Sequence, residues 1–365
     1  MRQITVLFQA PNGIGLGHIS RLAAIAQALR SKVPSARVPF LLEGGSHSLL
    51  EAASLPYLTL PNNHALYESG SWEAWPKEER YSLIVNIAES IIRRIRPELI
   101  LFDTIPCIPV VIAAANRKIP AAICVRKVKE MGGYFERLDK FQEQIKCLII
   151  PHETDEVGVP SRWLPRTRFV GRIVRSNPRA DVKLNLPAGS KTIVISGGGG
   201  GYPNTVDFYN WALTSFATCQ ARNPDLICLL VTGPLFNDWW KLNLINGVRV
   251  IPFDPNLISI MANADLVICQ AGYNTIAEVT QLGVPTICVP ADRGMDDQYE
   301  RAKQSAASNS NFHICRASEK DRLTLLIDRC LKSPSTERSS DRIASMGATR
   351  AAEALLELIT EIPLE

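Results

Sequence analysis

The chain has 365 residues, 46% of them hydrophobic, and a formal net charge of +4 at pH 7. This length is too great for one ordinary hydrophobic core and predicts two domains. The net charge is too small to indicate nucleic acid as a partner. The first 170 residues carry 21 Lys and Arg against 16 Asp and Glu, so the positive charge is concentrated in the first half of the chain.

The sequence has neither the basic start and apolar stretch of a secretory signal nor an apolar run long enough for a membrane-spanning helix. Its nine cysteines are scattered through apolar runs, without a C-x-x-C pair or the spacing of a metal site. We therefore expect a cytoplasmic protein with reduced cysteines and no bound metal.

The first half alternates short apolar runs with stretches of helical periodicity. A β-rich run at residues 4–10 leads into the glycine-bearing turn PNGIGLGH and then into a helical stretch that ends near Arg30. Further strands are expected at residues 38–43, 98–103, 121–125 and 146–151. Continuous apolar strands between helices predict a parallel sheet that is covered on both faces.

The same pattern starts again in the second half. An aperiodic stretch rich in proline and polar residues, Thr167 to Ser190, is typical of a linker, and KTIVISGGGGG follows it. Strands are expected at residues 192–196, 226–233, 248–253, 265–270 and 285–290. We expect domains at residues 1–170 and 191–348, a linker at residues 171–190, and a C-terminal segment at residues 349–365 whose amphipathic helix packs back across the domains.

Five consecutive glycines, Gly197 to Gly201, follow directly on an apolar strand. Such a run lets the backbone approach a ligand closely, and the helix after it offers free N–H groups to a pyrophosphate. The alternative is a flexible loop without a ligand. Neither glycine loop of the sequence has the spacing of the dinucleotide fingerprint, which disfavours NAD.

A second glycine turn begins at Gly272. Thr275 and Glu278 follow at intervals of three residues, so the turn opens a helix with exposed N–H groups, a hydroxyl and, one turn later, a carboxylate. Free amides suit phosphate, and an acidic residue can accept hydrogen bonds from both ribose hydroxyls. This pattern predicts a nucleotide site.

The G-x-x-T-x-x-E block from Gly272 to Glu278, with the segments LGVPTICVP and DDQYERA after it, resembles the GT-B glycosyltransferases. The resemblance is to family 28, which includes a lipid-linked N-acetylglucosaminyltransferase of peptidoglycan synthesis and the monogalactosyldiacylglycerol synthases. It is clearest over residues 190–330. It implies a GT-B fold, in which two Rossmann-like α/β domains face a cleft, with a UDP-sugar donor in the second domain and an acceptor in the first.

The resemblance also implies a set of donor-binding residues. Glu278 would bind the ribose, Phe253 would lie near the uracil, and Asp297 with Gln298 would contact the sugar. The whole set is Arg172, Gly197, Gly198, Gly199, Gly200, Phe253, Gly272, Asn274, Thr275, Glu278, Asp297 and Gln298. The chain departs from the peptidoglycan enzyme at Gln270, where that enzyme carries a basic residue, and it lacks the serine and glutamine that follow the glycines there.

The segment GIGLGHISR resembles the N-terminal glycine loop of the family, which implies that Gly15, Gly17 and Arg21 contact the acceptor. His18 stands at the start of the following helix, where it suits a general base or a phosphate ligand; a capping or packing role is the alternative. Arg21 lies one turn further on, where it can meet an acceptor phosphate or carboxylate or else remain solvated. Asp103, at the end of a predicted strand, competes with His18 for the role of base, and its alternative is a helix cap.

We expect an acceptor hydroxyl to attack the anomeric carbon of the donor sugar while UDP leaves. Glycine-loop amides, helix dipoles and Arg172 would stabilise the leaving diphosphate, so no metal or other cofactor is expected. The resemblance implies inversion at the sugar and leaves the acceptor, lipid-linked or glycan, open. The alternatives are a nucleotide-sugar hydrolase of GT-B-like fold and a non-catalytic subunit that binds a nucleotide sugar.

The basic first half, the segment SIIRRIR at residues 90–96, and the tryptophans Trp72 and Trp75 also suggest contact with a membrane. A basic surface with aromatic neighbours can rest on anionic lipid. The alternative is a solvated helix face with packed tryptophans.

Overall fold

The computed structural model describes residues 3–11, 13, 15–61, 76–175, 185–187, 189–332 and 346–361. Within these ranges the chain forms two compact units. Residues 15–17 and 185–332 belong to the second unit, and the rest belong to the first. Trp72 and Trp75, and residues 176–184 and 188 of the predicted linker, lie outside the described residues.

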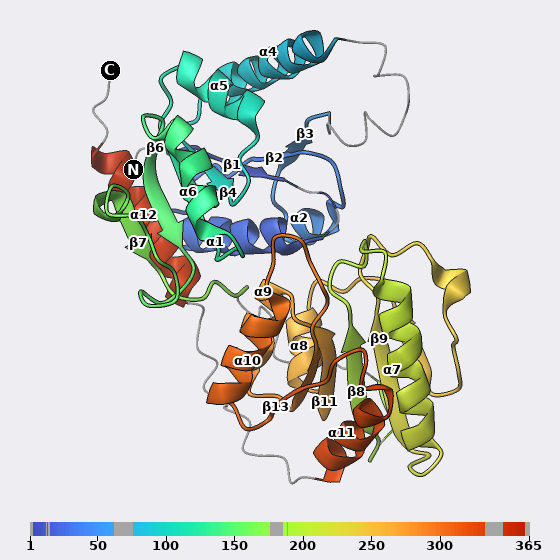
Figure 1. Cartoon of the computed structure of the whole chain (residues 1–365). Helices are drawn as coiled ribbons and strands as arrows, with labels where there is room; N and C mark the ends of the chain where they lie inside the picture. Colours follow the sequence, from blue (N-terminus) through green and yellow to red (C-terminus); the bar gives the residue numbers. More distant parts are fainter. Residues whose placement is uncertain are drawn as a thin grey trace. The chain divides into compact units, whose positions relative to one another are not determined.

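A seven-stranded parallel sheet forms the centre of the first unit, in the order β3-β2-β1-β4-β5-β6-β7. Its strands are β1 (Val6–Ala10), β2 (Phe40–Leu42), β3 (Tyr57–Thr59), β4 (Leu99–Asp103), β5 (Ala121–Cys124), β6 (Ile145–Ile150) and β7 (Thr167–Phe169). The helices are α1 (Gly17–Lys32), α2 (Ser48–Ala52), α4 (Lys77–Ile95), α5 (Ile108–Asn116), α6 (Met131–Leu138) and α12 (Met346–Glu361), with single 3-10 turns at η1 (Asp139–Phe141) and η2 (Leu164–Arg166). The arrangement is shown in Figure 1.

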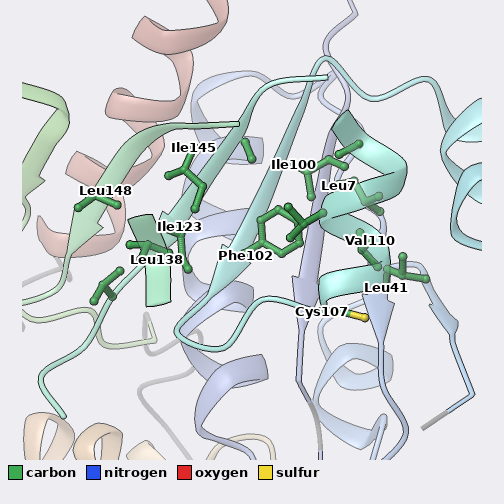
Figure 2. Packing of buried hydrophobic residues seen from close by; sticks show 14 of the residues in the cluster. Leu7, Leu41, Ile100, Phe102, Cys107, Val110, Ile123, Leu138, Ile145 and Leu148 are labelled. Atoms are coloured by element: carbon green, nitrogen blue, oxygen red, sulfur yellow. The ribbon is translucent and has the colours of Figure 1, made fainter. Parts of the chain in front are cut away.

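Apolar side chains from both faces of this sheet are buried, as the continuous apolar strands predict. On one face, Leu7, Phe102 and Ile123 pack with Val110 of α5 and with side chains of α4 and α6 (Figure 2). On the other face, Phe8 and Phe40 are fully buried, and their rings stack at 5.1 Å. The sheet is therefore covered on both sides.

The helix α12 comes from the end of the described chain but packs in the first unit, beside β6 (Figure 1). Gly347 allows a close approach there, because a Cβ at this position would lie 2.2 Å from the carbonyl oxygen of Arg172. The first residues of the stretch predicted to be a linker are also structured: Thr167–Phe169 forms β7, and Val170 and Ile173 are buried. The strand β7 pairs with β6, and local sequence does not reveal this pairing.

The second unit has a six-stranded parallel sheet in the order β10-β9-β8-β11-β12-β13. Its strands are β8 (Lys191–Ser196), β9 (Leu226–Val231), β10 (Val248–Ile251), β11 (Leu266–Gln270), β12 (Thr286–Val289) and β13 (Phe312–Ile314). Its helices are α7 (Thr205–Gln220), α8 (Leu257–Ala262), α9 (Tyr273–Leu282), α10 (Gln298–Ser308) and α11 (Lys320–Lys332), with a 3-10 turn at η3 (Trp239–Lys241). The helices α7 and α11 cover the sheet face that carries Ile193 and Ile268.

Both sheets are wholly parallel and doubly wound, which confirms the predicted fold class of two Rossmann-like units. The nine cysteines are all buried and unbridged. No helix among the described residues has both the length and the apolar character needed to cross a bilayer.

Candidate active site

Many of the predicted site residues, although not Arg172, Phe253, Asp297 or Gln298, lie where the strand order of each sheet reverses. In parallel α/β sheets, ligands bind at the carboxyl ends of the two strands that flank this point. In the first unit these strands are β1, which leads to His18, and β4, which ends at Asp103. In the second unit they are β8, which runs into the five glycines, and β11, which ends at Gln270.

Asp103 is the centre of a buried polar cluster in the first unit. Its Oδ1 atom lies 2.6 Å from Nδ1 of His18 and accepts a hydrogen bond of 2.5 Å from Nη2 of Arg21. Its Oδ2 atom accepts a hydrogen bond of 2.8 Å from Nε of Arg21. The aspartate and the arginine side chains are 0% and 1% exposed, whereas the histidine side chain is 22% exposed. Of the three, only His18 reaches solvent.

Burial alone would raise the pKa of Asp103, but the charges and hydrogen bonds of Arg21 and His18 outweigh it and hold this pKa well below its usual range. The carboxylate is therefore ionised and can only accept hydrogen bonds. It follows that Nδ1 of His18 carries the proton and donates the hydrogen bond to Oδ1 of Asp103. This tautomer leaves Nε2 of His18 with the lone pair that a general base needs.

The cluster revises two expectations from the sequence. Arg21 is buried and paired with Asp103, so it is not placed to meet an acceptor directly. Asp103 is not a helix cap, because α5 begins after Cys107 and has no side-chain cap. With its oxygens occupied and its pKa lowered, Asp103 is also poorly suited to take a proton, and orienting His18 is the role that its geometry fits.

Thr104 holds the end of β4 in an unusual backbone conformation next to this carboxylate. Its φ is +50°, a left-handed value that costs a branched residue free energy. Its Oγ1 donates to Oδ1 of Asp103 at 2.9 Å, and its carbonyl accepts a hydrogen bond of 2.7 Å from the hydroxyl of Tyr134. The turn is therefore fixed from both sides, which keeps Asp103 in place.

In the second unit, packing accounts for several of the five glycines. A Cβ at Gly197 would lie 2.8 Å from the hydroxyl of Tyr209. Gly200 has a φ of +86°, and a Cβ there would lie 2.4 Å from the carbonyl oxygen of Thr232. Gly233, with a φ of +89°, packs as closely against the glycine loop from the end of β9. Glycine is thus required by the contact of two loops, whether or not a ligand binds.

The backbone N–H groups of the glycine loop divide into two sets. The amide of Gly197 donates to the hydroxyl of Tyr209 at 3.0 Å, and the amide of Gly198 donates to Oγ of Ser196 at 3.3 Å. The amides of Gly199 and Gly200 donate to no atom of the described residues. They remain as donors for an anion ahead of α7.

The predicted nucleotide residues after β11 lie on the first turns of α9. Gly272 is its N-cap, and Asn274 and Thr275 are partly exposed in its first turn. Glu278 is 5% exposed, so its carboxylate is more enclosed than the sequence indicates. Phe253 is partly exposed in the loop between β10 and α8.

Asp297 and Gln298 have structural partners. Asp297 is the N-cap of α10, and its carboxylate accepts the N–H of Glu300 at 3.0 Å. Gln298 is buried, and its Oε1 accepts the N–H of Ala291 at 2.9 Å. Its side chain therefore holds the loop after β12.

Gly15 and Gly17 lie in the β1–α1 loop and at the first position of α1, as the glycine pattern predicts. Arg172 lies in the first unit. Its charge adds to the hydrogen bond from His152, the larger cause, in lowering the pKa of Glu156. The local sequence around Arg172 gave no indication of this carboxylate.

The sequence did not identify Arg293, which lies in the loop between β12 and α10. Its Nη2 donates to Oε1 of Gln270 at 2.9 Å, and its Cζ lies 3.3 Å from the centre of the Tyr202 ring. An arginine therefore supplies a positive charge next to Gln270. The contacts join residues far apart in the sequence, so no local signal could have found them.

Within the described part of the chain, no cluster of His, Cys, Asp or Glu side chains is arranged to hold a metal ion.

Comparison with known proteins agrees with this architecture. Residues 229–355 match the family model of the glycosyltransferase family 28 C-terminal domain. The UDP-N-acetylglucosamine--N-acetylmuramyl-(pentapeptide) pyrophosphoryl-undecaprenol N-acetylglucosamine transferase of Bacillus cytotoxicus is 25% identical over 377 residues, which cover 95% of this chain and 96% of that protein.

Two solved structures show the same fold. The glycotransferase of kitacinnamycin superposes with a TM-score of 0.64 at 17% identity, over 98% of this chain and 100% of that one. MurG of Acinetobacter baumannii superposes with a TM-score of 0.55 at 18% identity, over 98% of this chain and 100% of that one.

The fold, the matched domain and the sequence relatives define the chain as a glycosyltransferase of the GT-B type. The match to the family 28 model begins in β9 of the second unit and extends into α12 of the first. The predicted fold and enzyme class are thereby confirmed.

Proposed function

We propose that the chain transfers a hexose or N-acetylhexosamine from a UDP-sugar to the hydroxyl of a lipid-linked or glycan acceptor. The observation that carries the proposal is the cluster of His18, Asp103 and Arg21 at the strand-order reversal of the first unit. It provides an oriented general base. The second unit provides, at its own reversal, unoccupied glycine-loop amides and the N-terminus of α9.

In the proposed reaction, the acceptor oxygen attacks the anomeric carbon and the bond from that carbon to the diphosphate oxygen breaks. UDP leaves with the electron pair. The hydroxyl proton moves to Nε2 of His18, and the ionised Asp103 stabilises the imidazolium that forms. A single displacement of this kind inverts the configuration at the sugar.

The donor proposal rests on the second unit. The amides of Gly199 and Gly200, and those at the start of α9, suit the negative diphosphate, and the dipole of each following helix favours the same charge. Glu278 would accept the ribose hydroxyls. These donors can stabilise the leaving diphosphate without a metal ion. By its name, the Bacillus cytotoxicus relative uses UDP-N-acetylglucosamine, which makes this the first donor to assay.

A thermal-shift screen with UDP, GDP and TDP, followed by product analysis, tests the proposal. UDP should stabilise the protein most, because a ligand that binds only the native state raises its stability by mass action. With UDP-N-acetylglucosamine and a polyprenyl-pyrophosphoryl N-acetylmuramyl-pentapeptide, we expect UDP release to depend on the acceptor. Full-rate release of UDP and free sugar without acceptor would instead establish a hydrolase. UDP binding without any turnover would leave a nucleotide-sugar-binding subunit.

We also propose that the first unit contacts anionic membrane, where a lipid-linked acceptor would be found. Arg93, Arg94 and Arg96 are exposed at the C-terminal end of α4. Three neighbouring guanidinium groups on one helix end can attract anionic headgroups. The membrane proposal is independent of the donor site.

A further inference from the structure

Arg293 lies between the two elements that the proposed function assigns to the donor diphosphate. Its side chain contacts Tyr202, directly after the glycine run, and Gln270, at the carboxyl end of β11. Gln270 stands two residues before Gly272, the N-cap of α9. A guanidinium group is thus placed at the strand-order reversal of the second sheet.

The hydrogen-bonding capacity of this guanidinium is only partly used. Arginine has five N–H donors, and Nη2 of Arg293 gives one of them to Gln270. Its Nε is buried and has no hydrogen-bond partner among the described residues. The two N–H groups of Nη1 and the second N–H of Nη2 also donate to no described residue, and these terminal donors suit an anionic ligand.

The charge of Arg293 is also not neutralised by an ion pair within the described part of the chain. The nearby carboxylate of Asp296 is instead bonded to both terminal nitrogens of Arg301. Arg301 in turn donates to the carbonyl of Ala271 at 2.8 Å. Burial lowers the pKa of Arg293, while Tyr202 and Asp296 act against this, so the group is partly removed from water without an ion-pair partner among the described residues.

The loop that carries Arg293 is held on both sides. Gln298 accepts the N–H of Ala291, and the pair of Asp296 and Arg301 ties the loop to the turn after β11. The position of the guanidinium is therefore fixed before a ligand arrives. A cation that is already in position stabilises the negative charge that develops on a leaving diphosphate.

We propose that Arg293 binds the diphosphate of the nucleotide-sugar donor through its unused N–H groups. This inference rests on the proposed function and adds to it a specific cation for the leaving group. Tyr202 and Gln270 act as positioning residues for it. A purely structural role, in which Arg293 only joins the two loops, would affect binding of the whole nucleotide.

Isothermal titration calorimetry with UDP and uridine separates these roles. Arg293→Met keeps the apolar stem and removes the charge, so we expect the Kd for UDP to rise about 10- to 100-fold, the range of a hydrogen bond to a charged group. The Kd for uridine should stay unchanged, because uridine has no phosphate. Arg293→Lys keeps the charge without the planar fork, and we expect it to bind UDP with intermediate affinity.

Two further variants complete the experiment. Because Gln270 already touches the guanidinium, Gln270→Arg added to Arg293→Met should return much of the lost affinity for UDP. Arg316→Met is the matched control, because Arg316 also stacks on a tyrosine, with its Cζ 4.4 Å from the Tyr299 ring, but lies outside the proposed site. It should leave both affinities unchanged.

The results distinguish the inference from the proposed function. If wild-type protein binds UDP and Arg293→Met binds it equally well, the inference is overturned and the proposed function stands. Equal losses of UDP and uridine affinity would show a structural role and also overturn it. If wild-type protein binds no nucleoside diphosphate, both fall. If Arg293→Met does not fold, Arg293→Lys decides, because undiminished UDP binding by this variant contradicts a role for the fork.

Discussion

At the scale of single residues, three charged or titratable side chains of the first unit form one cluster, of which only the His18 side chain is partly exposed. Asp103 and Arg21 are buried and satisfy each other, and what they present to solvent is the imidazole of His18. A buried ion pair contributes little net stability, but removal of one partner leaves the other charge uncompensated. The pair of Asp103 and Arg21 therefore holds the His18 ring in one orientation, and mutation of either partner should disturb this orientation.

We predict that Asp103→Asn lowers kcat at least about 100-fold, because the amide no longer fixes the productive tautomer of His18. It should also reduce the free energy of unfolding by about 3–5 kcal/mol, since Arg21 loses its buried partner. His18→Ala should lower kcat by a similar factor with a much smaller loss of stability. Steady-state kinetics and urea unfolding of the two variants measure this difference, and equal losses of stability would contradict it.

The lowered pKa of Asp103 also gives the stability difference a pH dependence. A carboxyl group whose pKa is lower in the folded state stabilises the protein fully above its unfolded-state pKa, here the ordinary value of 3.8. This contribution is lost as the pH falls below that value toward the folded-state pKa. Wild type and Asp103→Asn should therefore converge in stability as the pH falls below 3.8, and a difference that stays undiminished below this pH would exclude the ion pair as its cause.

At the scale of elements, the glycine run packs closely against a neighbouring loop and also keeps backbone amides available for a ligand. Gly200 is required by the contact with Thr232 and Phe236, whereas Gly198, also at positive φ, has no atom within 4 Å of an added Cβ. The loop is thus held in shape by packing, and its remaining amides stay available. Gly200 is therefore required both by its φ and by close packing, whereas Gly198 is required by its φ alone.

We predict that Gly200→Ala destabilises the protein by about 2–5 kcal/mol, through the left-handed φ and the overlap with Thr232. Gly198→Ala is the matched control and should cost about 1–2 kcal/mol from its φ alone. Denaturant unfolding of both variants provides the comparison. If Gly198→Ala were the more damaging of the two, the packing explanation would be wrong.

The elements also show what local sequence can and cannot predict. The long apolar runs gave the positions of ten strands, because a buried parallel strand is apolar throughout. The strands β3, β7 and β13 were missed; each has three residues, lies at a sheet edge and is partly exposed, so it has no distinctive pattern.

The site, like the fold, was predictable only where its residues give a local signal in the sequence. Glycines and the histidine at strand–helix turns are local signals, and the structure places these turns at the two strand-order reversals. The pairing of Arg21 with Asp103 joins residues 82 positions apart, and that of Arg293 with Gln270 joins residues 23 positions apart. Such pairs depend on the tertiary fold, and the sequence order alone does not contain them.

At the scale of the whole molecule, the net charge of +4 is too small to bind a membrane without a local concentration of charge. We predict that Arg93→Gln with Arg94→Gln weakens binding to phosphatidylglycerol vesicles by about 30-fold, near 1 kcal/mol for each arginine. Arg316→Gln with Arg322→Gln removes the same charge from the second unit and should have no effect. Vesicle co-sedimentation tests this, and equal losses in the two double variants would contradict a specific role for α4.

The position of α12 affects the order in which the protein can assemble during synthesis. Residues 346–361 complete the first unit beside β6, but the ribosome makes the whole second unit before them. At ordinary rates of translation this delay is on the order of ten seconds. During that time the second unit can fold completely, whereas the surface that α12 will cover stays open to water and to chaperones. The half of the enzyme that is made first is therefore the half that is finished last.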